Sequence, residues 1–196
     1  MQKLKTAQEL QSRLTAILDL TAQEFRPLSE EQLRWKPAAD RWSILECLQH
    51  LNLAERFYIR NIQHKVDRLG IQQTNPTDQA MQSDWVGKAM RYIVDPEMKI
   101  KVPAPGVIRP RRASELQPAE VLGQFIELQT LLHELLNKAV YLDWNQEKVM
   151  SLFGNWLKLR LGDTLLMLVA HTERHINQAM RVKEEMGNFA ATNNNL

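Results

Sequence analysis

Apolar side chains recur every three to four residues along four long segments, and this repeat limits the fold more than any other feature of the sequence. The segments span residues 3–25, 44–69, 118–136 and 159–186. A helix with 3.6 residues per turn gathers such side chains on one face, which must then be buried against other helices. No segment convincingly predicts a strand. We therefore expect an all-α fold, a four-helix bundle with one long crossover between its second and third helices.

The expected helix boundaries rest on caps and prolines. Ser43 followed by Glu46 has the spacing of a capping box at the start of the second helix, and Gly70 suits its end. Six of the eight prolines fall at 76–118, so the segment 71–117 is expected to be a largely irregular crossover. Within it, residues 78–91 predict a short helix anchored by Trp85. We expect one domain at 1–188 and a loose tail at 189–196.

Overall charge and cysteine content exclude several classes of protein. The 25 basic and 23 acidic residues give a net charge of +2, which argues against a dedicated nucleic-acid or membrane-surface protein. We interpret the one basic cluster, residues 109–112, as a solvated surface. Cys47 is the only cysteine, so an internal disulfide is excluded and a reducing compartment is favoured. Because no stretch approaches about 18 apolar residues, we expect a cytoplasmic protein with no membrane partner.

Two histidines interrupt the buried face of the last helix. His171 and His175 lie one turn apart, and on the second helix His50 shares an apolar face with Cys47. A buried polar group without a partner costs about 1–3 kcal/mol, so these imidazoles must either accept or donate hydrogen bonds or share a cation. Two histidines four residues apart can bind one ion, and the third makes a metal site the favoured interpretation.

The other two histidines are not expected to be ligands. His64 lies on the same stripe as His50, but fourteen residues correspond to about 21 Å along a helix axis. His133 shares a half-polar face with its neighbours, which indicates the surface. Cys47 is close enough along its helix to approach a metal, although a lone helical cysteine is more often an inert core residue.

Four stretches of the sequence resemble the DinB/YfiT-like superfamily, and they occur in that family's order. The segment 41–55 resembles its Trp-Ser helix start, with a histidine seven residues after the serine. The segment 168–182 is similar to its last helix, with a His-x-x-x-His pair and a following glutamine. Residues 25–43 and 153–171 resemble the segments that precede these two motifs.

The resemblance implies a four-helix bundle, commonly dimeric, in which three histidines hold a divalent metal ion such as nickel or zinc. Placed on matching positions, these ligands are His50, His171 and His175. It further implies a small-molecule substrate, with a low-molecular-weight thiol as one candidate, and either hydrolysis or thiol transfer as the reaction. No nucleic-acid partner is expected.

Two residues are candidates to orient these histidines. Glu46 lies one turn before His50, and Gln178 lies near His175. Glu46 is at least equally suited to be the cap partner of Ser43. Two other functions stay open at this point: a non-enzymatic, stress-related bundle protein whose metal or histidine cluster is structural, and a binding protein that uses the basic crossover.

Overall fold

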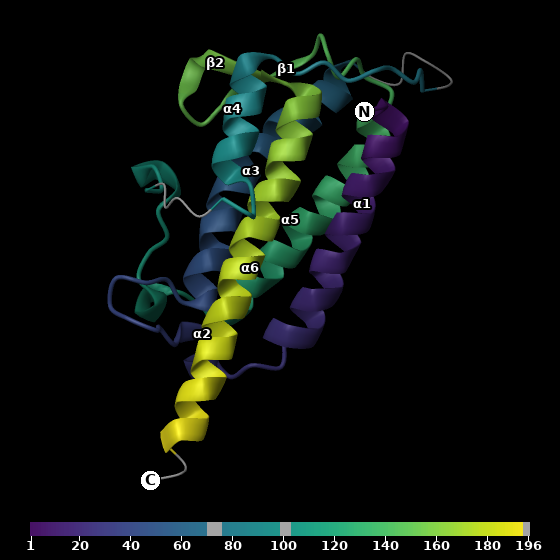
Figure 1. The fold of residues 1–196 in the computed structure, drawn as a ribbon. Coiled ribbons are helices and arrows are strands. Elements are labelled where there is room, and N and C mark those ends of the chain that lie inside the picture. Colours follow the sequence, from purple (N-terminus) through teal and green to yellow (C-terminus); the bar gives the residue numbers. More distant parts are fainter. Residues whose placement is uncertain (70–75, 99–102, 194–196) are drawn as a thin grey trace.

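The computed structural model describes residues 1–69, 76–98 and 103–193, and most of them are helical (Figure 1). Two short strands and several single turns complete the fold. The helices and strands are α1 (Lys3–Leu20), α2 (Glu30–Arg34), α3 (Ile44–Leu69), α4 (Trp85–Val94), α5 (Pro118–Ala139), β1 (Lys148–Ser151), β2 (Gly154–Arg160) and α6 (Leu161–Asn193). The expectation of an all-α chain thus holds in its broad form.

The four long helices α1, α3, α5 and α6 pack around one apolar core. Residues Asn52 and Glu55 of α3 contact Val121 and Gln129 of α5 in that order, so these two helices run parallel. Arg13 and Glu24 in the N-terminal region pair with Glu173 and Lys183 of α6, again in order along both segments. Side chains from all four helices are fully buried, among them Leu14, Leu48, Leu132 and Leu165.

The start of α3 is the capping box predicted from the sequence. The Ser43 hydroxyl accepts from the backbone N–H of Glu46 at 3.1 Å, and the Glu46 carboxylate accepts from the backbone N–H of Ser43 at 2.8 Å. This cap fixes the first turn of α3 and therefore the position of His50, one turn further along.

The crossover returns from the far end of α3 to its beginning. The backbone N–H groups of Arg111 and Ala113 donate to Gln49 and Glu46 of α3. Two single turns of 3₁₀-helix, Gly106–Ile108 and Ala113–Glu115, shape this return just before α5 begins at Pro118. The irregular crossover consequently lies against the part of α3 that carries His50.

The expectation of no strand was wrong. Strands β1 and β2 form an antiparallel hairpin, with Lys148 opposite Arg160 and Met150 opposite Lys158. The hairpin turn is possible because Gly154 adopts a φ of 109°, a left-handed conformation that favours glycine. These segments form strands because their burial alternates from residue to residue. Val149 and Leu159 enter the core while their neighbours face out. Helix α6 accordingly starts at Leu161 rather than at 159.

The predicted role of Trp85 was also wrong. A helix does interrupt the crossover, but Trp85 is 78% exposed at its first residue. The buried residue of α4 is instead Gly87, which packs against the Asp163 side chain of α6. Asp84 caps the helix by accepting from the Gly87 N–H, so the cap and the close approach place α4 without an aromatic anchor.

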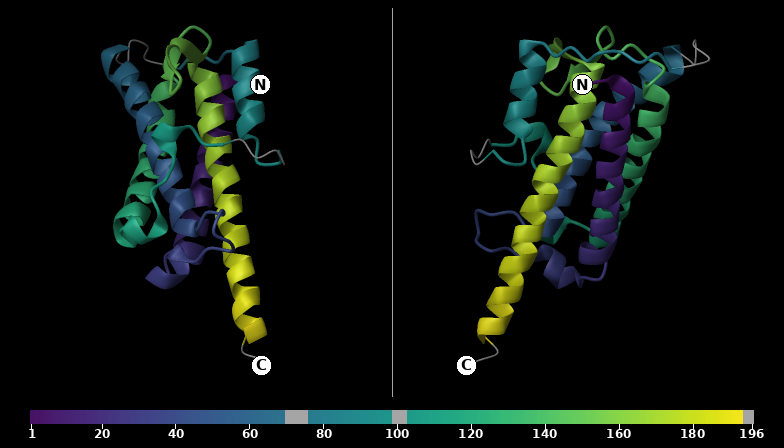
Figure 2. Two further views of the ribbon diagram at one scale, coloured as in Figure 1. Left: turned by 90° about the vertical axis from the view of Figure 1, so that its left-hand side faces the viewer. Right: turned by 45° about the vertical axis from the view of Figure 1, so that its right-hand side comes forward.

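The segment expected to be loose is mostly helical. Helix α6 continues to Asn193, and its last turns project beyond the other helices (Figure 2). The Phe189 ring lies 6.2 Å from that of Trp35, and Glu185 pairs with Arg41, so this end contacts the chain before α3. Residues 194–196 lie outside the described residues. Within the described ranges, no helix is long and apolar enough to cross a bilayer.

Candidate metal centre

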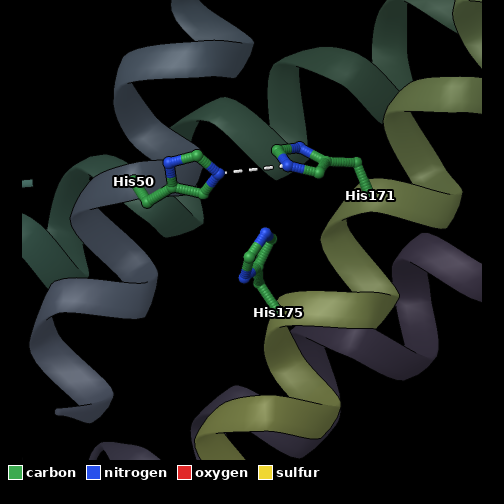
Figure 3. Close-up of side chains that lie close together, drawn as sticks. All are labelled: His50, His171 and His175. Carbon is green, nitrogen blue, oxygen red and sulfur yellow. Dashed lines mark hydrogen bonds between the residues drawn. The ribbon is translucent and has the colours of Figure 1, made fainter. Parts of the chain in front are cut away.

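Helices α3 and α6 bring His50, His171 and His175 together (Figure 3). One ring nitrogen from each lies within 4.8 Å of the other two, and the Nε2 atoms of His50 and His171 are 3.1 Å apart. The three rings meet edge to face, with centroids 4.5–5.1 Å apart. The sequence prediction that these three histidines share one site is thus consistent with their geometry.

A backbone carbonyl of the crossover determines which nitrogen of His50 faces the cluster. His50 Nδ1 lies 2.8 Å from the Ile108 carbonyl oxygen. Because a carbonyl only accepts, Nδ1 carries the proton and Nε2 keeps its lone pair. That lone pair points toward His171. Metal-binding histidines are commonly oriented in this way, with one ring nitrogen held by a hydrogen bond and the other directed at the metal.

Gln178 does the same for His175. The Gln178 side-chain oxygen accepts from His175 Nδ1 at 3.0 Å, so Nε2 of this ring also keeps its lone pair. Gln178 follows His175 by three residues on α6, which places both side chains on one face. This hydrogen bond supports the predicted role of Gln178 in orienting His175.

Burial keeps all three rings neutral at pH 7. It lowers the pKa of His50, and the bond to the Ile108 carbonyl offsets this only in part. Burial, together with the neighbouring His50, lowers the pKa of His175 to about 3. Burial and the two other histidines lower the pKa of His171 well below its usual value. Metal ions bind the neutral imidazole, so the rings are in the form that a ligand requires.

The donor set fits a divalent ion of the borderline class. Zinc–nitrogen bonds of about 2.0–2.1 Å in a tetrahedral site place two ligand nitrogens about 3.3 Å apart. The 3.1 Å separation of the His50 and His171 nitrogens is close to that value, and a His175 nitrogen lies within 4.8 Å of both. Within the described part of the chain, the cluster contains these three residues and no carboxylate or thiol.

Trp42 forms one wall of the centre. Its ring centroid lies 5.0 Å from that of His50 and 5.8 Å from that of His175. Trp42 is half-buried and directly precedes the capping serine, so the helix cap also fixes this aromatic wall.

Glu46 is not an orienting residue for His50. Its carboxylate accepts from the Ser43 and Ala113 N–H groups and from Lys36, which makes it a helix cap and a crossover contact. Glu46 takes this role because it lies in the first turn of α3, where backbone N–H groups have no partner within the helix and attract its carboxylate.

The remaining sequence expectations for this region concern residues outside the cluster. His64 is exposed, and His133 lies half-buried on α5; neither belongs to the cluster. Cys47 is fully buried, and burial raises the pKa of its thiol, as expected of an inert core residue.

Sequence reasoning missed Ile108. The contact uses a backbone carbonyl, which every residue carries, so no residue type could signal it. The only indirect sign was that the second ring nitrogen of His50 needed a hydrogen-bond acceptor. Nothing in the sequence placed the crossover beside that nitrogen.

Comparison with known proteins supports one family. The sequence model described as the DinB superfamily matches residues 13–179, which include all three histidines. No curated protein and no solved structure gives a significant match to the chain.

Proposed function

The chain belongs to the DinB superfamily, and from this premise we propose that it is a metal-dependent enzyme. His50, His171 and His175 would hold a divalent ion such as nickel or zinc, and the reaction would be hydrolysis or transfer to a low-molecular-weight thiol. The observation that carries the proposal is the pair of Nε2 lone pairs that Ile108 and Gln178 direct into the cluster.

Three neutral imidazoles would leave a bound divalent ion its full charge and an open position, and such an ion would supply the activation of water or a thiol. The protein supplies the rest. Ile108 and Gln178 hold two of the three rings in the required tautomer, so these two rings need no change of tautomer on binding. Trp42 covers the His50 and His175 rings with an apolar surface, which limits access of water from that side.

The structural alternative is a cluster that only stabilises the core. A structural ion is usually enclosed by four protein ligands. The cluster contains three candidate ligands among the described residues, and this supports an enzyme over a structural site.

Metal analysis of the purified protein tests the ligand set. We expect about one divalent ion per chain in the wild type and in His64→Ala, which removes an exposed histidine of α3 outside the cluster. His171→Ala should lose most of the metal while keeping the helical circular dichroism spectrum. Equal metal content in all three proteins would contradict the proposal.

Cobalt substitution separates the reaction classes. If the protein uses a thiol, adding a small thiol to the cobalt-loaded wild type should produce a thiolate-to-cobalt charge-transfer band in the near ultraviolet. Turnover of simple esters or amides without that band would indicate a hydrolase. A cobalt protein inert to both, and strongly destabilised by a chelator, would support the structural alternative.

We also propose a cytoplasmic homodimer, an expectation that comes from the family resemblance and the single cysteine. The pairwise directions of the four long helices support a four-helix bundle with its crossover between α3 and α5. Sedimentation equilibrium tests the dimer, and a monomer at micromolar concentration would refute it.

A further inference from the structure

A basic cavity of about 550 Å³ lies where the β-hairpin meets the last turns of α3, away from the histidine cluster. His64 lines this cavity and follows His50 by fourteen residues, which is about 21 Å along the helix axis. The cavity is therefore a separate place in the fold.

Four cationic side chains and a single carboxylate line the cavity. Lys65 pairs with that carboxylate, Glu147, at 2.6 Å. Arg68, Lys148 and Lys158 form no ion pair with any described residue. The sequence of the segments 70–75 and 99–102 contains no aspartate or glutamate that could neutralise these three side chains.

The hairpin register holds two of these charges on one face. Lys158 pairs with Met150, two residues from Lys148, so both lysines extend from the same side of the sheet. Arg160, directly opposite Lys148, instead pairs with Asp84 at 3.4 Å. The two lysines thus remain as like charges on neighbouring positions, an arrangement that an anion between them stabilises.

The hairpin is held firmly against α3. The backbone N–H of Leu152 donates to the Tyr58 hydroxyl, and the Lys65–Glu147 pair joins α3 to the residue before β1. The charged groups of the cavity therefore come from two elements whose relative positions are fixed before any ligand binds.

We propose that this cavity binds a small molecule carrying a multivalent oxyanion group, a phosphate or a polycarboxylate. Arg68, Lys148 and Lys158 contact the anion, and Met150 supplies an apolar surface beside it. The site is independent of metal binding at the histidines.

Isothermal titration calorimetry of the full chain in HEPES buffer at low salt tests this site, with pyrophosphate and citrate as separate probes. The wild type should bind at least one of them, with an affinity that falls as sodium chloride is added. The double variant Lys148→Gln/Lys158→Gln should bind about tenfold more weakly, which corresponds to about 1.4 kcal/mol for the two removed charges together. Preference for pyrophosphate or citrate identifies the oxyanion class.

Lys88→Gln provides the matched control, since Lys88 is an exposed lysine of α4 that does not line the cavity. It should bind as the wild type does. The proposal is overturned if the wild type binds neither probe at millimolar concentration, or if the double variant binds as tightly as the control. Binding of single-stranded DNA without binding of either small anion would also overturn it.

Discussion

We predict that the buried Glu55 makes the stability of the protein depend on pH, and that replacing it with glutamine removes this dependence. Its side chain is fully buried and contacts Gln129 of α5 and the Thr172 hydroxyl of α6, the latter at 2.6 Å. The same hydroxyl lies 2.9 Å from the Leu168 carbonyl oxygen, and its one proton can serve only one of these contacts. The hydroxyl therefore stabilises a Glu55 carboxylate only in part, and the buried side chain favours the neutral acid.

Burial raises the pKa of Glu55 from 4.5 to about 7, while the bonds from Thr172 and Gln129 oppose the rise. Between these two values the folded chain keeps a proton that the unfolded chain has lost. The contribution of Glu55 to stability is therefore greatest below pH 4.5 and falls by about 1.4 kcal/mol per pH unit up to pH 7. The total loss is roughly 3 kcal/mol, and above pH 7 this contribution stays constant.

Urea unfolding of wild type and Glu55→Gln at several pH values between 4 and 9 measures this effect. Glutamine keeps a neutral hydrogen-bonding side chain, so the stability of the variant minus that of the wild type should rise with pH and level off near pH 7. Groups common to both proteins cancel in this difference.

Glu127→Gln removes an exposed carboxylate of α5 and controls for the loss of a charge. A Glu55→Gln difference that is constant over the whole range would refute the neutral acid. So would a wild type that gains stability over the variant as pH rises, since that would show a stabilising carboxylate.

Three further substitutions test packing and the metal centre. In Gly87→Ala the new Cβ would lie 2.1 Å from the Asp163 carboxylate, so urea unfolding should show a loss of about 1–3 kcal/mol. Gln178→Ala removes the acceptor of His175 Nδ1, and chelator competition should show metal affinity lowered about 10- to 100-fold with little change in fold. Trp144→Ala removes a fully buried ring and should cost about 3–5 kcal/mol of stability.

The chain offers a matched control for each substitution. Gly123→Ala adds a Cβ with nothing within 4 Å and should leave stability equal or slightly higher. Asn177→Ala alters the exposed neighbour of Gln178 and should not change metal affinity. Trp156→Ala removes a ring that is 79% exposed and should cost little. Equal losses in any variant and its control would contradict the corresponding argument.

The helices and the three clustered histidines could be predicted because each leaves a local pattern. Apolar period, the Ser43–Glu46 cap and the four-residue histidine spacing all act within one or two turns of chain. The hairpin was missed because β1 has only four residues, too few for alternation to outweigh the adjoining helical pattern. Trp85 was misplaced because size alone predicts burial, whereas α4 uses a glycine to approach Asp163 closely.

The crossover contacts the proposed metal site through its backbone, so the site does not depend on the crossover being a helix or a strand. Its contact with His50 runs through the Ile108 carbonyl, and its contacts with Gln49 and Glu46 run through backbone N–H groups. Every residue except proline carries both backbone groups, so substitutions other than proline within 106–113 can keep these bonds, provided the path of the chain is kept. Insertion or deletion within 106–113 should therefore weaken metal binding more than substitution does, because only a change of path moves the carbonyl away from His50.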